Sequence, residues 1–231
     1  MSPTPRVADR NAIRDWGPPF GARPQRTGPL LIDCCANITA AIISAGNPKA
    51  HVQRAITNPP AIHLVFEGWN PLHCAAINRH DVVAMLLIEN GAVVCAAAVD
   101  GMTPLQCTAY DGHAVVCELL ISKGANVSPV DKRGRTALFT AGKRGDEELA
   151  QILVANGADV SIGDLNGRTP LHFAVMAMHT SVSRLLFEKG ANVSAVDRWG
   201  KTLIHTATRY SNDAVIQLLH DRSTPSPEET S

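Results

Sequence analysis

The chain has 231 residues, and its 21 Lys and Arg side chains are balanced by 21 Asp and Glu side chains. A formal net charge of zero excludes a general electrostatic attraction to nucleic acid or to an anionic membrane, so binding of that kind would need a local basic patch. With 45% hydrophobic residues the chain can bury a core, and its 6 cysteines lack C-x2-C metal spacing, which predicts reduced thiols.

Residues 1–65 show no clear repeat. Residues 1–30 contain prolines and arginines without hydrophobic periodicity, which predicts a disordered N-terminal arm. This arm lacks the apolar run of a signal peptide, and no segment has the roughly 18 apolar residues that span a bilayer. We therefore expect an intracellular protein, cytoplasmic and/or nuclear, with no membrane partner. Residues 31–65 are predicted to form a degenerate capping repeat or a helical cap.

From residue 66 onward, two short motifs recur together with a period of 33 residues. One is a Gly-Ala pair, which begins at Gly91, Gly124, Gly157 and Gly190. Two motifs that share one period indicate a repeat architecture. The other motif is a tetrapeptide with the five copies Asn70-Pro71-Leu72-His73, Thr103-Pro104-Leu105-Gln106, Thr136-Ala137-Leu138-Phe139, Thr169-Pro170-Leu171-His172 and Thr202-Leu203-Ile204-His205.

Each unit has the pattern of two helices that follow a turn. Thr is a favoured N-cap and Pro is tolerated in the first helical turn, so Thr103 and Pro104 predict the start of a helix. A second apolar pattern, which includes Val116 and Leu120, predicts another helix. That helix is expected to end at Gly124, because a left-handed C-cap costs glycine little.

This pattern resembles the ankyrin repeat in its Thr-Pro-Leu-His tetrapeptide, its Gly-Ala pair and its Asp-x-x-Gly turn. The resemblance implies an all-α fold, an ankyrin repeat solenoid of helix-turn-helix units linked by β-turn fingers. Because Ala137 and Phe139 replace Pro and His, we expect the third repeat to be the least regular. The five repeats are predicted at residues 66–98, 99–131, 132–164, 165–197 and 198–222, before a disordered tail at 223–231.

His73, His172 and His205 invite a catalytic or metal-binding interpretation because they occupy one column of the repeats. The resemblance implies a structural role instead, in which each histidine hydrogen-bonds between its tetrapeptide and the adjacent turns. Cys74 and Cys107 occupy the next column and are predicted to be small buried side chains. We therefore predict a non-catalytic protein without a catalytic site, cofactor or metal, with a Cys/His enzyme as the remote alternative.

The resemblance also implies that a concave groove binds protein partners through residues outside the motifs. Projecting the period onto turn tips and first helices places nine cations there against Asp100 and Asp111, with most of the Trp and Tyr residues. Arg, Trp and Tyr are enriched at interface hot spots, which favours an acidic or phosphorylated partner segment. The predicted partner-binding residues are Trp69, Met102, Tyr110, Lys132, Arg133, Arg135, Lys143, Arg144, Arg168, Met176, Arg198, Trp199, Lys201, Arg209 and Tyr210.

The function predicted from these residues is therefore an adaptor or scaffold, which we expect to be a monomer. An ankyrin-only transcriptional co-regulator acting in the nucleus is the main alternative. The basic positions could also be merely solubilising, or could follow a nucleic-acid backbone, which the neutral net charge disfavours. Thr224-Pro225 and Ser226-Pro227 are candidate phosphorylation sites in the tail.

Overall fold

The computed structural model describes residues 68–210 and 212–221. The predicted arm at 1–30, the predicted cap at 31–65 and the tail at 223–231, with its two candidate phosphorylation sites, lie outside the described residues. Within the described range the chain forms ten α-helices and no strand, apart from an isolated bridge between Val196 and Thr202.

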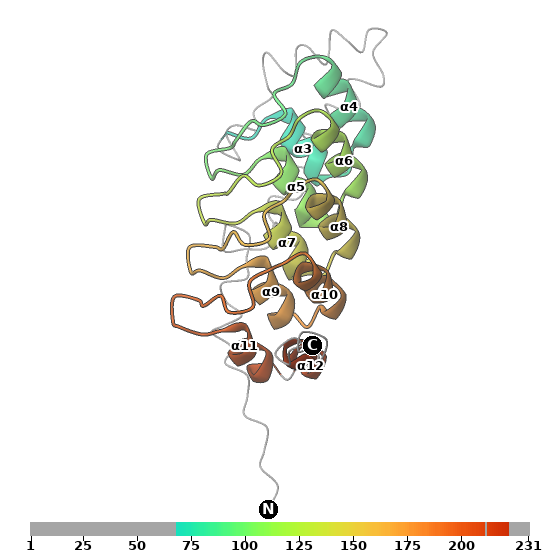
Figure 1. The fold of residues 1–231 in the computed structure, drawn as a ribbon. Helices are drawn as coiled ribbons and strands as arrows, with labels where there is room; N and C mark the ends of the chain where they lie inside the picture. The colour runs from blue at the N-terminus through green and yellow to red at the C-terminus, as the bar shows by residue number, and fades with distance from the viewer. Residues whose placement is uncertain (1–67, 211, 222–231) are drawn as a thin grey trace, which may run out of the picture.

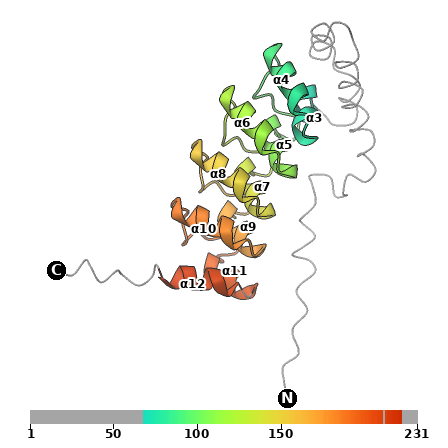
Figure 2. The same cartoon turned by 90° about the vertical axis from the view of Figure 1, so that its right-hand side faces the viewer.

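The ten described helices form five pairs, one in each predicted repeat (Figure 1). The first helices of the pairs stack in one column and the second helices in another (Figure 2). The architecture is an all-helical repeat solenoid, as the sequence predicts. The pairs are α3 (Pro71–Ile77) with α4 (Asp81–Glu89), α5 (Pro104–Asp111) with α6 (Ala114–Ser122), α7 (Ala137–Arg144) with α8 (Glu147–Ala155), α9 (Pro170–Met176) with α10 (Thr180–Glu188), and α11 (Leu203–Arg209) with α12 (Asp213–Asp221).

Capping residues of the tetrapeptide fix where the first helices begin. The Thr103 hydroxyl accepts a hydrogen bond from the backbone N–H of Gln106 at 3.4 Å, and Pro104 occupies the first helical position of α5. The helix ends at Gly112, whose φ of 75° is the left-handed conformation that glycine adopts at low cost. A short polar turn then leads directly into α6.

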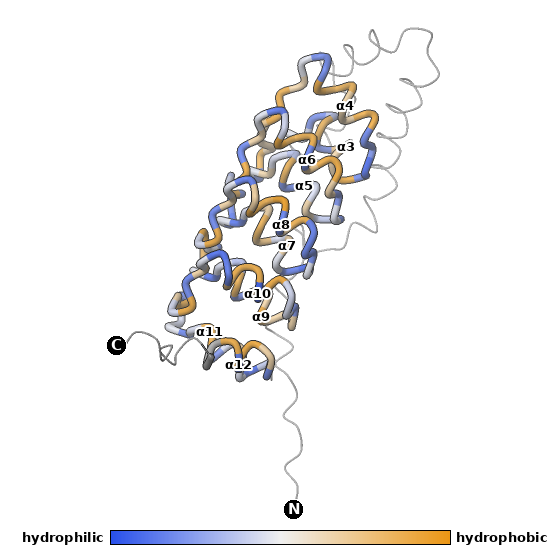
Figure 3. Tube along the Cα trace, turned by 45° about the vertical axis from the view of Figure 1, so that its right-hand side comes forward, coloured by the Kyte–Doolittle hydropathy of each residue, from blue (hydrophilic) through white to orange (hydrophobic). Residues whose placement is uncertain are grey.

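Buried leucines at repeat-equivalent positions form the core between the two columns. Leu72, Leu105, Leu138 and Leu171 lie on the first helices, and Leu87, Leu120, Leu153 and Leu186 lie on the second helices. Hydrophobic residues follow the helices, and hydrophilic ones gather at the turns (Figure 3). Since a helix pair cannot bury both faces alone, each repeat depends on its neighbours for stability. The longest described helices have 9 residues, well short of the roughly 20 that span a bilayer.

The third repeat is as regular as the second, so the expectation that it would be the least regular is wrong. Its helices α7 and α8 have 8 and 9 residues, the same lengths as α5 and α6. Thr136 still caps α7 through the N–H of Phe139 at 3.1 Å. The Phe139 ring packs on Phe173 with ring centroids 4.3 Å apart, so an aromatic contact occupies the position of the missing histidine.

A turn that we call a finger joins each described repeat to the next. The fingers comprise residues 97–102, 130–135, 163–168 and 196–201, and they project from the same side of the stack (Figure 1). Backbone hydrogen bonds also connect neighbouring fingers, for example Lys132 N–H to Asp100 C=O at 2.9 Å. The fingers therefore form a continuous edge along the solenoid.

Candidate functional site

The tetrapeptide histidine His73 is fully buried and connects two repeats. Its Nδ1 accepts from the Asn70 N–H at 3.2 Å, and its Nε2 lies 3.0 Å from the carbonyl oxygen of Met102. Because a carbonyl can only accept, the single proton of the neutral ring is assigned to Nε2, which leaves Nδ1 as the acceptor for the Asn70 N–H although Nδ1 also lies 2.8 Å from Asn70 Oδ1. Burial lowers the pKa of His73 to about 4, which keeps the ring neutral near pH 7. These contacts give His73 a structural role.

The same bonds form in the second repeat, although glutamine replaces histidine there. The Gln106 Oε1 accepts from the Thr103 N–H at 2.9 Å, and its Nε2 donates to the Arg135 carbonyl at 2.7 Å. In the fourth and fifth repeats His172 and His205 accept from the N–H of Thr169 and Thr202, both at 3.2 Å. The bond within the repeat therefore recurs in this column, whereas the bond to the next repeat is formed by His73 and Gln106, and the buried Nε2 of His172 has no hydrogen-bond partner among the described residues.

The column of cysteines beside these histidines is unsuited to nucleophilic chemistry. Cys74 and Cys107 are both fully buried. Burial, aided by the negative charge of Asp100, raises the pKa of the Cys107 thiol well above its usual value. A protonated buried thiol is a poor nucleophile. Over residues 68–210 and 212–221, His, Cys, Asp and Glu form no cluster of three that could hold a metal ion.

Two residues of the predicted interaction surface belong instead to the core. Trp69 is 5% exposed and stacks on the His73 ring at 5.6 Å between centroids, and Met102 is 3% exposed. The expectation that they face outward is wrong, because their position lies at the base of the finger. In the first complete finger the residue that faces Met102 across the turn is Ala98, whose N–H donates to the Met102 carbonyl at 2.8 Å. Because Ala98 offers no charged or polar side chain to pair with, an apolar side chain packs opposite it at the position of Met102.

Two predicted arginines at the same finger position are held in ion pairs. The Arg135 Nε donates to Asp131 Oδ2 at 2.8 Å, and the Arg168 Nη2 donates to Asp164 Oδ2 at 2.8 Å. Burial alone would lower the pKa of Arg135, but Asp131 and Tyr110 outweigh it and the pKa is raised. These pairs close the fingers, since Asp131 also accepts from the N–H of Arg133 and of Arg135. Arg135 and Arg168 are therefore structural cations.

The seven other predicted cations lie outside these two ion pairs. Lys143 is half-buried, and the other six are exposed. Among the predicted aromatic residues, Trp199 is 58% exposed, whereas Tyr110 and Tyr210 are half-buried, as is Met176. We call the surface formed by the seven cations and Trp199 the basic face; its residues are Lys132, Arg133, Lys143, Arg144, Arg198, Trp199, Lys201 and Arg209.

Several positive charges of the fingers and of α7 act on Lys143. Burial lowers the pKa of Lys143, and the positive charges of Arg135, Arg168, Arg133 and Arg144 lower it further. These cations come from two neighbouring fingers and from the last turn of α7. Arg135 and Arg168 already pair with Asp131 and Asp164, so an anion bound nearby would relieve mainly the repulsion among Lys143, Arg133 and Arg144.

Comparison with known families places most of the chain in one family. A family model described as ankyrin repeats in three copies matches residues 91–164 and again 143–228, and a single ankyrin-repeat model matches residues 67–98. The chain belongs to the ankyrin-repeat family. No curated protein matches the chain. Ankyrin repeats are generally non-catalytic modules for protein interaction, so a protein-interaction role is supported.

The structure contains a second set of hydrogen bonds between the ankyrin repeats that was not predicted from the sequence. The N-cap residues of three second helices donate to carbonyls of the preceding repeat: His113 Nε2 to Ile77 at 2.9 Å, His179 Nε2 to Lys143 at 3.2 Å and Asn212 Nδ2 to Val175 at 3.2 Å. These positions recur at multiples of 33 residues, so the period could have identified them as a second structural column. Asp146, which has no proton to donate at this position, caps its own helix through the Leu149 N–H at 3.0 Å.

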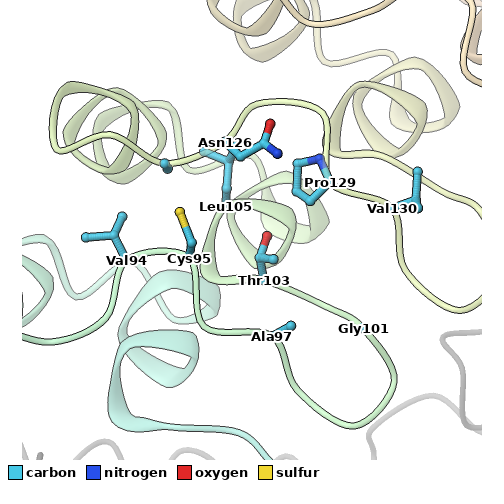
Figure 4. A pocket seen from close by; sticks show the side chains of 10 residues that line it. Val94, Cys95, Ala97, Gly101, Thr103, Leu105, Asn126, Pro129 and Val130 are labelled. Carbon is cyan, nitrogen blue, oxygen red and sulfur yellow. The ribbon is translucent and has the colours of Figure 1, made fainter.

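One cavity of about 240 Å³ lies between the loops of the first and second ankyrin repeats (Figure 4). Its lining is mainly apolar and includes Val94, Leu105 and Pro129. The Thr103 hydroxyl in its wall already caps α5, and the exposed Cys95 thiol lies 3.6 Å from the Gly124 carbonyl. Ligand sites usually combine an apolar cavity with several converging polar groups. The basic face, and not this cavity, is therefore the candidate functional site.

Proposed function

We propose that this ankyrin-repeat protein is a non-catalytic adaptor or scaffold that binds an acidic or phosphorylated segment of another protein through its basic face. The observation that carries this proposal is the set of exposed cations, Arg133 and Arg144 among them, on the same face as half-buried Lys143, whose pKa burial and neighbouring positive charges lower. A carboxylate or phosphoryl group placed there would offset the repulsion among the cations. Charge-assisted hydrogen bonds to Arg or Lys are also stronger than neutral ones.

The exposed Trp199 gives the basic face a site for apolar contact. Its ring is 58% exposed, and the Arg198 guanidinium lies 5.1 Å from the ring centroid. A large ring that is already held by a neighbouring cation loses little conformational freedom on binding. Charged residues mainly set the association rate, whereas buried aromatic contacts mainly set the dissociation rate. The two contributions can therefore be measured separately.

The distribution of aromatic residues favours a protein over a nucleic acid. Single-stranded nucleic acid is typically bound by successive aromatic platforms along a basic groove. Of the predicted aromatic residues, Trp69 is buried, Tyr110 and Tyr210 are half-buried, and only Trp199 is exposed. A nuclear co-regulator would differ from a cytoplasmic adaptor in its partner and compartment, but would use the same basic face.

The proposal is tested by binding kinetics against peptides selected from a displayed library of acidic and phosphorylated sequences. We expect Lys132→Glu combined with Arg133→Glu to slow association and to flatten its salt dependence. Trp199→Ala should weaken binding by about 2 kcal/mol or more, mainly through faster dissociation. Arg135 is left unchanged, because its substitution would break the ion pair with Asp131.

Gln151→Ala and Gln217→Ala serve as matched controls for these variants. Both side chains are exposed on second helices, away from the basic face. They should bind the selected peptides with parental kinetics. If the Lys132/Arg133 and Trp199 variants also bind with parental kinetics, the basic face is not the binding surface.

A further inference from the structure

The two residues at the tip of each finger form a row, and the first of the two alternates between apolar and cationic side chains from finger to finger. In the first finger Val99 is 49% exposed, and in the third finger Leu165 is 74% exposed. The second and fourth fingers carry exposed cations at the same position. We call this set the fingertip row; its members are Val99 and Asp100, Lys132 and Arg133, Leu165 and Asn166, and Arg198 and Trp199.

Backbone hydrogen bonds hold the fingertip row together. Successive fingers are joined by Lys132 N–H to Asp100 C=O at 2.9 Å, Leu165 N–H to Arg133 C=O at 2.9 Å and Arg198 N–H to Asn166 C=O at 2.7 Å. The distance from one finger to the next has two parts. Hydrogen-bonded backbones lie about 5 Å apart, and the two tip residues of a finger are separated by a further Cα–Cα distance of about 3.8 Å. The step is thus about 9 Å, in agreement with the 8–10 Å spacing of packed helices.

An extended chain rises about 3.3 Å per residue, so about three of its residues match one finger. A helix of about 10–12 Å diameter is wider than a row made of the two tip residues of each finger, of which Asp100 and Asn166 are half-buried. The shape of the row therefore suits an extended segment. Such a segment meets apolar and cationic fingers in turn.

We propose that the partner segment binds along the fingertip row in an extended conformation and presents aliphatic and acidic residues alternately at every third position. This inference rests on the proposed function and specifies its partner. The aliphatic residues contact Val99 and Leu165, and the acidic residues contact the second and fourth fingers.

The charges of the first and fourth fingers fix the register of the segment. Asp100 stands beside Val99, so an acidic residue at the first finger would meet a like charge. In the fourth finger Arg198 donates to Asn166 Oδ1 at 2.9 Å and stacks on Trp199, which fixes the guanidinium before a partner arrives. The row therefore disfavours a segment that is uniformly acidic.

Labelled synthetic peptides and the full chain test this inference by fluorescence anisotropy at low ionic strength. The probe has the sequence Leu-Ser-Ser-Glu-Ser-Ser-Leu-Ser-Ser-Glu, and a second probe has the reverse order, so that both chain directions are covered. Isomers of the same composition carry the two Leu and the two Glu as adjacent pairs. We expect the better of the two spaced probes to bind about tenfold tighter than its grouped isomer, because only correct spacing satisfies both kinds of finger.

Variants in single fingers test whether the preference for the spaced probe depends on the fingertip row. Leu165→Ser should remove most of the preference for the spaced probe, since this side chain is 74% exposed and its loss should leave the fold intact. Val130→Ser is the matched control, because this exposed valine belongs to the second finger but lies outside the row, and the variant should retain the preference. Lys132→Glu with Arg133→Glu should weaken binding of the spaced probe, and a probe with Lys only in place of the Glu that faces the second finger should recover it, because the fourth finger keeps its cation Arg198.

The outcomes separate the spacing from the proposed function. If spaced and grouped probes bind equally and both depend on Lys132 and Arg133, the basic face stands and the spacing is wrong. Tighter binding of a helix-forming probe with Leu and Glu seven residues apart would overturn the extended conformation. If no acidic probe binds, the proposed function fails together with this inference.

Discussion

The position of His73 requires one hydrogen-bond acceptor and one donor that point in opposite directions. Histidine meets this need with Nδ1 toward Asn70 N–H and Nε2 toward Met102 C=O. Gln106 meets it one repeat later with its amide oxygen and nitrogen. The two side chains differ in one respect, because only histidine can be protonated near neutral pH.

His73→Gln should therefore make the free energy of unfolding less dependent on pH. The pKa of His73 is lowered from 6.5 to about 4, so below pH 6.5 the unfolded chain binds a proton that the folded chain does not. Stability contributed by neutral His73 is full above the unfolded pKa and falls as the pH drops toward the folded pKa. Between pH 7 and pH 4 the parent should lose about 3 kcal/mol more than the variant.

Urea titrations of both proteins across this pH range give the measurement. Gln151→Ala is the control, because this exposed side chain does not titrate and its substitution should leave the pH dependence of the parent. Parallel pH profiles for the parent and His73→Gln would contradict the assignment of a buried neutral ring.

Among the elements, the fingers show that the residue type at one position depends on the residue that faces it across the turn. Asp131 is 7% exposed and holds Arg135 in an ion pair, whereas the first finger has Ala98 and Met102 at the equivalent positions. Both combinations close the same turn. In the charged version Asp131 accepts from both the guanidinium and the N–H of Arg135, whereas in the apolar version Asp100 accepts from the Met102 N–H at 3.0 Å.

Asp131→Ala should cost about 3 kcal/mol, because it leaves the Arg135 guanidinium and two backbone N–H groups without their acceptor. Adding Arg135→Met recreates the Ala98 and Met102 combination and should recover about 1–2 kcal/mol. Urea denaturation of the two variants measures both effects. A double variant that is no more stable than Asp131→Ala would show that the two finger types are not interchangeable.

The sequence predicted the helices of the fold better than it predicted the surface. The 33-residue period was enough to predict five helix pairs, because N-caps, leucines and glycines repeat with it. The period aligned Trp69 and Met102 with Arg135, yet alignment does not show whether a carboxylate or an alanine faces the position. Exposure at this column depends on contacts across the finger, which are absent from a one-dimensional pattern.

For the whole molecule, stability is shared between neighbouring repeats. Leu171 lies on α9 in the fourth repeat and is 1% exposed, between repeats on either side. Removal of its side chain leaves a cavity that touches more than one repeat. Because a repeat cannot fold without the interfaces to its neighbours, the effect should extend beyond α9.

Leu171→Ala should lower the free energy of unfolding by about 2–5 kcal/mol. Hydrogen exchange should become faster in the third and fifth repeats as well as in the fourth. Leu165→Ala is the matched control, since this leucine is 74% exposed and its loss should change stability by less than about 0.5 kcal/mol. A Leu171 variant as stable as the parent, or one with faster exchange in α9 alone, would contradict shared stability.

The fingertip row is held by backbone atoms, through bonds such as Leu165 N–H to Arg133 C=O. Every amino acid except proline supplies the same donor and acceptor, so the bonds persist whatever side chains the tips carry. Mutation can therefore alter Leu165 or Lys132 without disturbing the solenoid that displays them. Over evolutionary time, such a scaffold can acquire a new partner by single substitutions, while selection for folding acts on the tetrapeptides and leucines behind it.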